Sequence, residues 1–361
     1  MLLHDFLGWC AEHNEDLLFS LGRLETKSLE DRLSQITIDR PIYVTGLARA
    51  GTTILLELIS QNKAVASYRY MDFPFVMLPC WWGRFLQRGA KGNHHPIERS
   101  HADGLQVTPE SPEAMEEILW KHFFPASHDP TVRNVLNQYQ RASDFDAFYT
   151  QTIRKLLLSR GAHRYLAKNN YNIARLDYLG SLFPDARFVI PVREPVHHIA
   201  SLMKQHRLLS EEEKHDKRVL AYMRRSGHFE FGLDRRPLNL TSNDRTLKVQ
   251  ELWETGHDVE GWAKYWRDVH TYLANLLETN EMLAQCTLVV SYEKLCGNPK
   301  ENLARLYSHL GLVPEATLLA EQQKRLHLPS YYVPDFSESE LEIIRAETSD
   351  IRTRIARFFD R

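Results

Sequence analysis

Residues Gly46 to Thr53 (Gly-Leu-Ala-Arg-Ala-Gly-Thr-Thr) have the spacing of a phosphate-binding loop. The two glycines let successive backbone N–H groups point into one concavity, and the start of a following helix adds partial positive charge, so the loop favours an anion. Thr52 stands where the ATP-binding motif has a lysine, and Arg49 places a basic side chain inside the loop instead. This departure argues against an ATPase or kinase. The alternative is a tight turn in which Thr52 and Thr53 only cap the helix.

A second anion site is predicted where the expected strand 186–192, with its apolar run Phe188-Val189-Ile190, ends. Arg193 follows this strand directly, and Ser201 comes eight residues later. An arginine can contact a phosphate through two N–H groups, and a serine about two helical turns further on adds a hydroxyl donor. The alternative is an ion pair between Arg193 and Glu194 or another surface acid, with Ser201 in solvent.

Together the two motifs resemble those of sulfotransferases that use 3′-phosphoadenosine 5′-phosphosulfate (PAPS). In that family a Lys or Arg precedes Ser/Thr-Gly-Thr-Thr in the 5′-phosphosulfate loop, and a strand followed by Arg, Pro and Ser binds the 3′-phosphate. Ala48 replaces the usual proline, and Ala50 replaces the usual Ser or Thr and so lacks its hydroxyl. Further blocks resemble bacterial carbohydrate-type and tyrosylprotein-like members, scattered from about residue 40 to 312: Lys168-Asn169, Phe183-Pro184-Asp185-Ala186-Arg187-Phe188, Ser291-Tyr292-Glu293-Lys294-Leu295, Asn298-Pro299 and Leu310-Gly311-Leu312.

The resemblance implies an enzyme that transfers the sulfuryl group of PAPS to a hydroxyl of a carbohydrate or small molecule. The transfer is an in-line displacement that releases adenosine 3′,5′-bisphosphate and requires no metal. Arg49 is expected at the bridging and sulfonate oxygens, and Lys168 either beside the sulfonate or as a surface lysine. The donor's phosphates are expected to bind Gly46, Arg49, Ala50, Gly51, Thr52 and Thr53 at the 5′ end, and Arg193 and Ser201 at the 3′ end.

Attack by an acceptor hydroxyl needs a general base. Related enzymes take an acidic residue or a histidine from the segments after the first helix of the loop. Asp72 is the first candidate because it follows the expected second strand, and His101 is the second because a histidine titrates near neutrality. Asp103 lies close to His101 in the sequence and is a third.

The elements that must position these residues belong to an α/β fold with a P-loop-type central parallel sheet flanked by helices. A strand, a glycine loop and a helix follow one another from residue 36 to residue 60, which is the unit that builds parallel sheets. We expect a single domain over 1–361 with helical N- and C-terminal extensions. Within it, 1–35 is expected to be helical, the aromatic region 63–112 to form acceptor-side loops, and the polar region 204–260 to be an insertion or lid.

Composition excludes some functions. With 45 basic and 47 acidic residues the net charge is −2, which gives no reason to expect nucleic acid as a partner. The sequence predicts no membrane span and no signal peptide. Its four cysteines, Cys10, Cys80, Cys286 and Cys296, are too scattered for a disulfide framework, so we expect a cytoplasmic protein. The oligomeric state is left open, with a homodimer as one option.

Overall fold

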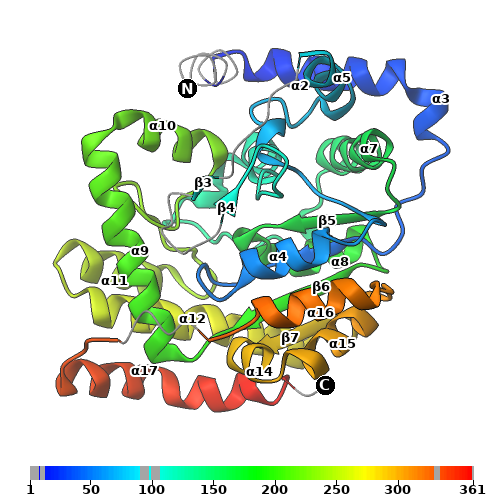
Figure 1. The fold of residues 1–361 in the computed structure, drawn as a ribbon. Coiled ribbons are helices and arrows are strands. Elements are labelled where there is room, and N and C mark those ends of the chain that lie inside the picture. The colour runs from blue at the N-terminus through cyan, green and yellow to red at the C-terminus, as the bar shows by residue number, and fades with distance from the viewer. Residues whose placement is uncertain (1–7, 9–12, 90–96, 99–105, 329–333, 360–361) are drawn as a thin grey trace.

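The fold is described from a computed structural model, for residues 8, 13–89, 97–98, 106–328 and 334–359. Its centre is a parallel sheet in the order β2-β5-β1-β6-β7 (Figure 1). The neighbouring strands are parallel at every pairing. The strands are β1 (Ile42–Val44), β2 (Val65–Ala66), β5 (Arg164–Lys168), β6 (Arg187–Val192) and β7 (Thr287–Ser291). The expected α/β fold with a central parallel sheet is confirmed.

Both faces of the sheet are covered, which explains why its strands read as nearly continuous apolar runs. Side chains alternate between the two faces of a strand, and in β1 Ile42 and Val44 belong to one apolar cluster while Tyr43 belongs to the other. Helices α4 (Thr52–Ser60) and α15 (Pro299–Leu310) supply leucines to the first cluster. Helices α7 (Ser143–Arg160), α8 (Leu176–Leu182) and α12 (Asp258–Thr279) supply the second.

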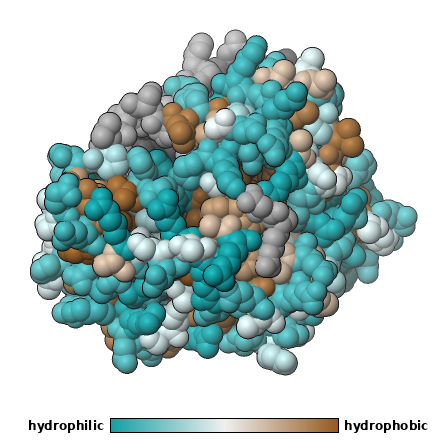
Figure 2. Space-filling view, turned by 90° about the horizontal axis from the view of Figure 1, so that it is seen from below, coloured by the Kyte–Doolittle hydropathy of each residue, from teal (hydrophilic) through white to brown (hydrophobic). Residues whose placement is uncertain are grey.

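Helices at both ends of the chain extend this core. In the N-terminal part, α2 (Glu15–Ser28) and α3 (Glu30–Leu33) pack on α7. At the C-terminal end, α17 (Glu338–Ala356) lies along α12 and also contacts α9 (Pro195–His215) (Figure 1). The remaining helices there are α13 (Glu281–Gln285), α14 (Tyr292–Gly297) and α16 (Ala316–Arg325). Seen from below, the outer face is mainly hydrophilic, and hydrophobic residues gather in recessed places (Figure 2).

The region 63–112 is more regular than the sequence suggested. It contains a short 3-10 turn η1 (Tyr70–Asp72), a helix α5 (Pro79–Gly89), and a ribbon of β3 (Ile97–Glu98) and β4 (Gln106–Val107). The aromatic residues obscure the helical pattern of this segment in the sequence. In the structure they make contacts of their own: Trp82 donates its indole N–H to the carbonyl of Met71 at 2.8 Å and packs on Phe75 and Phe85. After this region come α6 (Glu117–Phe123), η2 (Pro125–His128) and η3 (Gln138–Gln140).

The polar region 204–260 begins inside α9, so residue 204 is not a structural boundary. It continues with α10 (Lys217–Ser226) and, after an irregular stretch, α11 (Asn243–Glu254). The irregular stretch contains the buried residues Phe231 and Leu238, which belong to the main apolar cluster together with residues of α12. The region is therefore partly built into the core.

Candidate active site

The carboxyl ends of parallel strands lie at one edge of a sheet, so the residues that follow β1, β5 and β6 are brought together there. Val44 of β1 is paired with Lys168 of β5 and with Val189 of β6. The loop 45–51, the turn after Lys168 and the residue Arg193 all start from this edge. Residues that are far apart in the sequence thus surround one site.

The loop has a backbone conformation that glycine favours at two of its positions. Gly46 has φ +144° and Gly51 has φ +107°, and Arg49 also lies in the left-handed region with φ +68°. A Cβ on Gly51 would lie 2.7 Å from the ring of Tyr292. The N–H of Ala50 donates to the carbonyl of Leu47 at 3.3 Å, which closes the turn. Helix α4 begins at Thr52, so the N–H groups of its first turn have no partner within the helix and favour an anion.

The structure brings three of the expected anion-binding residues together. The Nε of Arg49 donates to the Oγ of Ser201 at 3.4 Å, and the Nη1 of Arg193 donates to the carbonyl oxygen of Arg49 at 3.4 Å. The guanidinium of Arg193 lies 5.2 Å from the centre of the Tyr292 ring, at a distance typical of a cation–π contact. Arg49, Arg193 and Ser201 are each half-buried, so the cluster is accessible to a ligand.

Glu194 does not pair with Arg193, contrary to the alternative reading of that motif. Its carboxylate caps α9 by accepting from the backbone N–H groups of Val196 and His197 at 3.0 and 3.3 Å. Its own N–H donates to the carboxylate of Glu293 at 2.9 Å. The first turn of α9 is therefore fixed by its caps, and the Arg193 side chain is left directed at the loop.

A buried histidine, His198, forms a hydrogen bond with the backbone of the loop. The Nε2 of His198 lies 2.8 Å from the carbonyl oxygen of Ala48, and its Nδ1 accepts from the indole N–H of Trp266 at 3.1 Å. The two contacts assign the proton to Nε2, which donates to Ala48. Burial lowers the pKa of His198 well below its usual value, and the charges of Arg193 and Arg49 lower it further. A neutral His198 thus fixes the residue that precedes Arg49.

The hydroxyl of Thr52 is linked to a carboxylate through one amide. It donates to the Oδ1 of Asn170 at 3.2 Å, and the Nδ2 of Asn170 donates to Glu230 at 2.8 Å. The Nδ1 of His228 lies 3.6 Å from the second carboxylate oxygen of Glu230. Burial raises the pKa of Glu230, but the hydrogen bond and charge of His228, together with the charge of Lys168, outweigh it and lower the pKa to about 2. Glu230 is therefore an ionised carboxylate beside the loop.

Two consecutive glutamates position the turn that carries Asn170. Glu116 accepts from the amide of Asn172 at 2.5 Å, and Glu117 accepts from the amide of Asn169 at 2.6 Å. Glu117 also pairs with Arg175 at 2.6 Å, and all of these side chains are buried. Buried carboxylates with satisfied partners fix a single arrangement, so the 3-10 turn η4 (Asn170–Arg175) is held rigidly.

Sequence reasoning missed Glu116, Glu117, His228 and Glu230. None of them belongs to a motif with fixed spacing, and the amide partners of the three glutamates lie more than 50 residues away in the chain. The Glu116-Glu117 pair had one usable signal, since two adjacent acidic residues beside the apolar run Ile118-Leu119-Trp120 need partners if they are buried.

Among the other catalytic candidates named from the sequence, Asp72 and Lys168 lie in different surroundings. Asp72 is buried, with 2% of its surface exposed, and both of its oxygens accept from the guanidinium of Arg160, at 2.6 and 2.9 Å. It also accepts from the N–H of Arg69 and so caps η1. Lys168 is buried at the end of β5, and its charge lowers the pKa of Glu113 and Glu230. His101 lies outside the described residues, as does Asp103.

Two further properties concern the described residues only. No group of three or more His, Cys, Asp or Glu side chains among them is arranged to hold a metal ion. Within the same ranges, every helix is too short or too polar to cross a membrane.

Comparison with known proteins points to one family. A family model described as the sulfotransferase family matches residues 41–226, more than half of the chain. The solved structure of a sulfotransferase from Mycobacterium avium has a TM-score of 0.51 and 13% identity over 90% of this chain and 80% of its own. A sulfotransferase from Mycobacterium tuberculosis has a TM-score of 0.49 and 17% identity, over 97% of this chain and 86% of its own. No curated protein matches the sequence.

Proposed function

Because the chain belongs to the sulfotransferase family, and so is a transferase of sulfur-containing groups, we propose that it transfers the sulfuryl group of PAPS to a hydroxyl of a carbohydrate or small molecule. The observation that carries the proposal is the contact between the two anion motifs: Arg49 of the loop reaches Ser201 of α9, and Arg193 reaches the backbone of Arg49. A donor with phosphates at both ends requires such a pair of sites.

The donor would lie across the carboxyl edge of β1 and β6. Gly46, Gly51, Thr53 and the first-turn N–H groups of α4 would hold its 5′-phosphate. Thr52 would contribute its backbone N–H rather than its hydroxyl, since its hydroxyl proton is directed at Asn170. The N–H of Ala50 closes the turn and would contribute only if that bond opened. Arg193 and Ser201 would hold the 3′-phosphate, where a bidentate arginine adds specificity as well as energy.

The chemistry is a displacement at sulfur. The acceptor oxygen forms a bond to sulfur while the bond between sulfur and the 5′-phosphate oxygen breaks, which yields a sulfate ester and adenosine 3′,5′-bisphosphate. Negative charge accumulates on the leaving oxygen, and Arg49 stands in the loop to stabilise it. Lys168, buried at the adjacent strand end, would add charge beside the sulfonate. Both side chains act by positioning and charge, as in phosphoryl transfer.

A proton must leave the acceptor hydroxyl, and the geometry favours Glu230 over Asp72 as the group that takes it. Asp72 is fully engaged with Arg160 and the cap of η1. Glu230 is ionised, lies one amide away from Thr52, and keeps lone pairs on the oxygen that faces His228. His228 would stabilise the carboxylate before the proton arrives. His101 stays a prediction from the sequence.

Thermal unfolding with two nucleotides tests the donor assignment. Adenosine 3′,5′-bisphosphate at about 100 times its Kd should stabilise the protein by about 2.7 kcal/mol and raise Tm without added Mg²⁺. ATP, which lacks the 3′-phosphate, should have a much smaller effect with or without Mg²⁺. The opposite pattern, stabilisation by Mg²⁺-ATP and none by the bisphosphate, would show that the chain binds a kinase-type nucleotide instead.

A further inference from the structure

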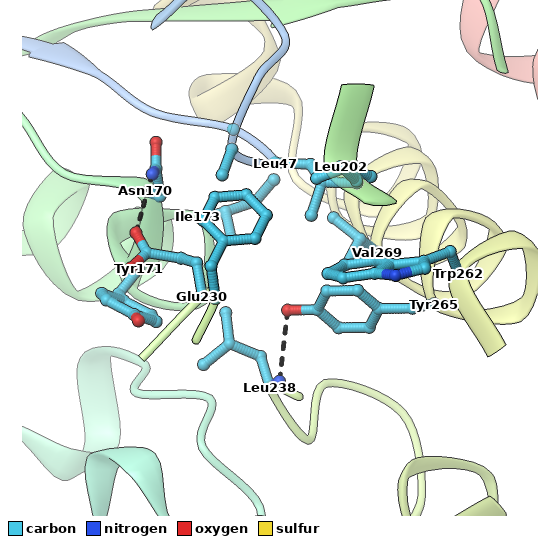
Figure 3. A pocket seen from close by; sticks show the side chains of 13 residues that line it. Leu47, Asn170, Tyr171, Ile173, Leu202, Glu230, Leu238, Trp262, Tyr265 and Val269 are labelled. Atoms are coloured by element: carbon cyan, nitrogen blue, oxygen red, sulfur yellow. Dashed lines mark hydrogen bonds between the residues drawn. The ribbon is translucent and has the colours of Figure 1, made fainter. Parts of the chain in front are cut away.

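A partly open cavity lies beside the anion loop, and the empty space there, open solvent included, is about 350 Å³. The residues Gly46, Leu47 and Ala48 form one wall of it, and the other walls come from η4, α9, the stretch 230–238 and α12 (Figure 3). Ala48 is the last of these loop residues that line the cavity, and Arg49 follows it directly. The cavity therefore adjoins the loop that carries Arg49, the residue that we assign to the sulfonate.

The walls of this cavity are predominantly apolar. Trp262, Tyr265 and Val269 of α12 lie on one side, and Asn170, Tyr171 and Glu230 lie opposite (Figure 3). The apolar remainder is Leu47, Ala48, Ile173, Leu202, Phe231 and Leu238. A pocket lined in this way, with few polar groups, favours an apolar ligand.

Most polar groups in the walls already have protein partners. The hydroxyl of Tyr265 accepts from the N–H of Leu238 at 3.2 Å, and the hydroxyl of Tyr171 accepts from the N–H of Phe229 at 2.7 Å. The amide oxygen of Asn170 accepts from Thr52, and its amide nitrogen donates to Glu230. A sugar would bring several hydroxyl groups into these walls, and each one left without a partner costs about 1–3 kcal/mol.

Among the described residues, two lining groups can still serve a ligand: the buried indole N–H of Trp262 has no hydrogen-bond partner there, and Glu230 is the only carboxylate that lines the cavity. Glu230 can accept one hydrogen bond from a ligand hydroxyl. Its charge is balanced by Lys168 and by the nearby His228, since both lower its pKa. A cationic ligand is therefore not required to neutralise it, and one neutral hydroxyl group matches what the walls offer.

We propose that this cavity binds the acceptor, and that the acceptor is a phenol or another compact apolar alcohol with a single hydroxyl group rather than a sugar. The inference rests on the proposed function and narrows its substrate class. The acceptor ring lies between α12 and η4 with its hydroxyl at Glu230. Its oxygen bonds to the sulfur of PAPS, the bond to the 5′-phosphate breaks, the proton passes to Glu230, and adenosine 3′,5′-bisphosphate leaves.

A panel of acceptors tests this class directly. Purified protein is incubated with radiolabelled PAPS and either para-nitrophenol, β-naphthol, methyl glucoside or N-acetylglucosamine, and the sulfated products are separated. The phenols should exceed the sugars in kcat/KM by roughly a hundredfold or more, because a sugar has several hydroxyl groups and each one buried without a partner costs about 1–3 kcal/mol. Equal or better turnover of a sugar, in protein that binds adenosine 3′,5′-bisphosphate, would overturn the inference and leave the proposed function intact.

Filling the cavity tests its location. Leu238→Trp and Val269→Phe, made separately, enlarge side chains on opposite walls, and each should raise KM for para-nitrophenol by roughly tenfold or more, since a misfitting pocket contact is worth about 1–3 kcal/mol. Leu233→Trp is the matched control, because Leu233 is exposed on the same stretch and does not line the cavity. The Kd for adenosine 3′,5′-bisphosphate should stay within about twofold in all three variants. Such a change is small on a scale where about 1.4 kcal/mol corresponds to a tenfold change.

Different results would contradict the proposed sulfuryl transfer and the proposed acceptor cavity. An unchanged KM in both filled variants would place the acceptor elsewhere and overturn the inference. Failure of the unaltered protein to bind adenosine 3′,5′-bisphosphate would overturn the proposed function and the inference that rests on it.

Discussion

The Nε of Arg49 and the Oγ of Ser201 lie 3.4 Å apart although 152 residues separate them in the chain. Arg49 comes from a loop between β1 and α4, and Ser201 from the second turn of α9. The contact exists because β1 and β6 are neighbours in the sheet and their following segments leave the same edge. It joins the predicted 5′ and 3′ ends of one donor site, and the predictions below follow from that geometry.

Replacing Arg49 should affect turnover more than folding. Arg49→Ala removes the charge next to the leaving oxygen, and the loss of one such group costs about 10²–10³ in kcat. Arg49→Lys should recover part of the rate, because it keeps the charge without the planar donor fork. The measurement is sulfuryl transfer from radiolabelled PAPS, with Tm as the check on folding. Turnover within a few-fold of the original in the alanine variant would contradict the assignment.

Replacing Arg193 should affect donor affinity. Arg193→Ala removes the expected bidentate contact to the 3′-phosphate, and a charge-assisted contact of this kind is worth about 1.5–3 kcal/mol, or roughly 10–100-fold in Kd. Titration calorimetry with adenosine 3′,5′-bisphosphate measures the change. Arg218→Ala is the control, since Arg218 forms a surface pair with Asp216. Equal affinities of the two variants would rule out the 3′-phosphate role.

Gly51 and Gly161 form a matched pair for the loop. Both have positive φ, but a Cβ on Gly51 meets Tyr292 at 2.7 Å while a Cβ on Gly161 meets nothing within 4 Å. Gly161→Ala should cost about 1–2 kcal/mol of stability from the backbone alone. Gly51→Ala should cost more and also weaken adenosine bisphosphate binding, because the Tyr292 ring underlies Arg193. Similar losses of stability and unchanged affinity in both variants would show that the close approach is unimportant.

Asp72 and Glu230 should differ in how neutralisation affects turnover. Asp72→Asn breaks a buried pair with Arg160 and should cost about 3 kcal/mol of stability, with turnover per folded molecule largely kept. Glu230→Gln keeps the bond to Asn170 but loses the charge that His228 and Lys168 balance, so Tm should fall as well, and kcat per folded molecule should fall about 10²–10⁴-fold if Glu230 takes the proton. Thermal unfolding and kcat of both variants decide the matter. The reverse outcome, an inactive folded Asp72 variant and an active Glu230 variant, would restore the assignment from the sequence.

The buried His198 should make stability depend on pH. Its pKa lies well below the usual value when folded, because burial disfavours the charged form. An unfolded histidine titrates near pH 6.5, so below that pH the unfolded chain binds a proton that the folded chain does not. Stability therefore falls as the pH decreases from about 6.5, with a limiting slope of about 1.4 kcal/mol per unit for each such group.

His198→Gln tests this dependence, since the glutamine amide can still donate to the carbonyl of Ala48. Between pH 6 and pH 5 the free energy of unfolding of the variant should fall less steeply than that of the unaltered protein, by up to about 1 kcal/mol per pH unit. Urea unfolding at several pH values gives both curves. Parallel curves would mean that His198 does not remain neutral in the folded state. His270, whose pKa burial lowers to about 4, stays in both proteins and cancels in the difference.

The sequence determined the parts of the site that depend on local geometry. The glycine spacing of the loop and the strand-to-helix junction before Arg193 are short-range patterns, and they specify backbone conformations that few other residues allow. The parallel sheet followed from the same junctions. Helix α5 was missed because its aromatic residues obscured the helical period, and the cytoplasmic location stays a prediction.

Tertiary structure decided which groups meet. Nothing in the sequence around Glu230 identifies it as a site residue. Its neighbours at the site lie far away in the chain, Lys168 at the end of β5 and Asn170 in the turn after that strand. Asp72 was a reasonable base by position, yet the fold gives its carboxylate to Arg160. The reason is physical: local backbone patterns are encoded by neighbouring residues, whereas the partner of a buried charge is set by which distant segments pack together.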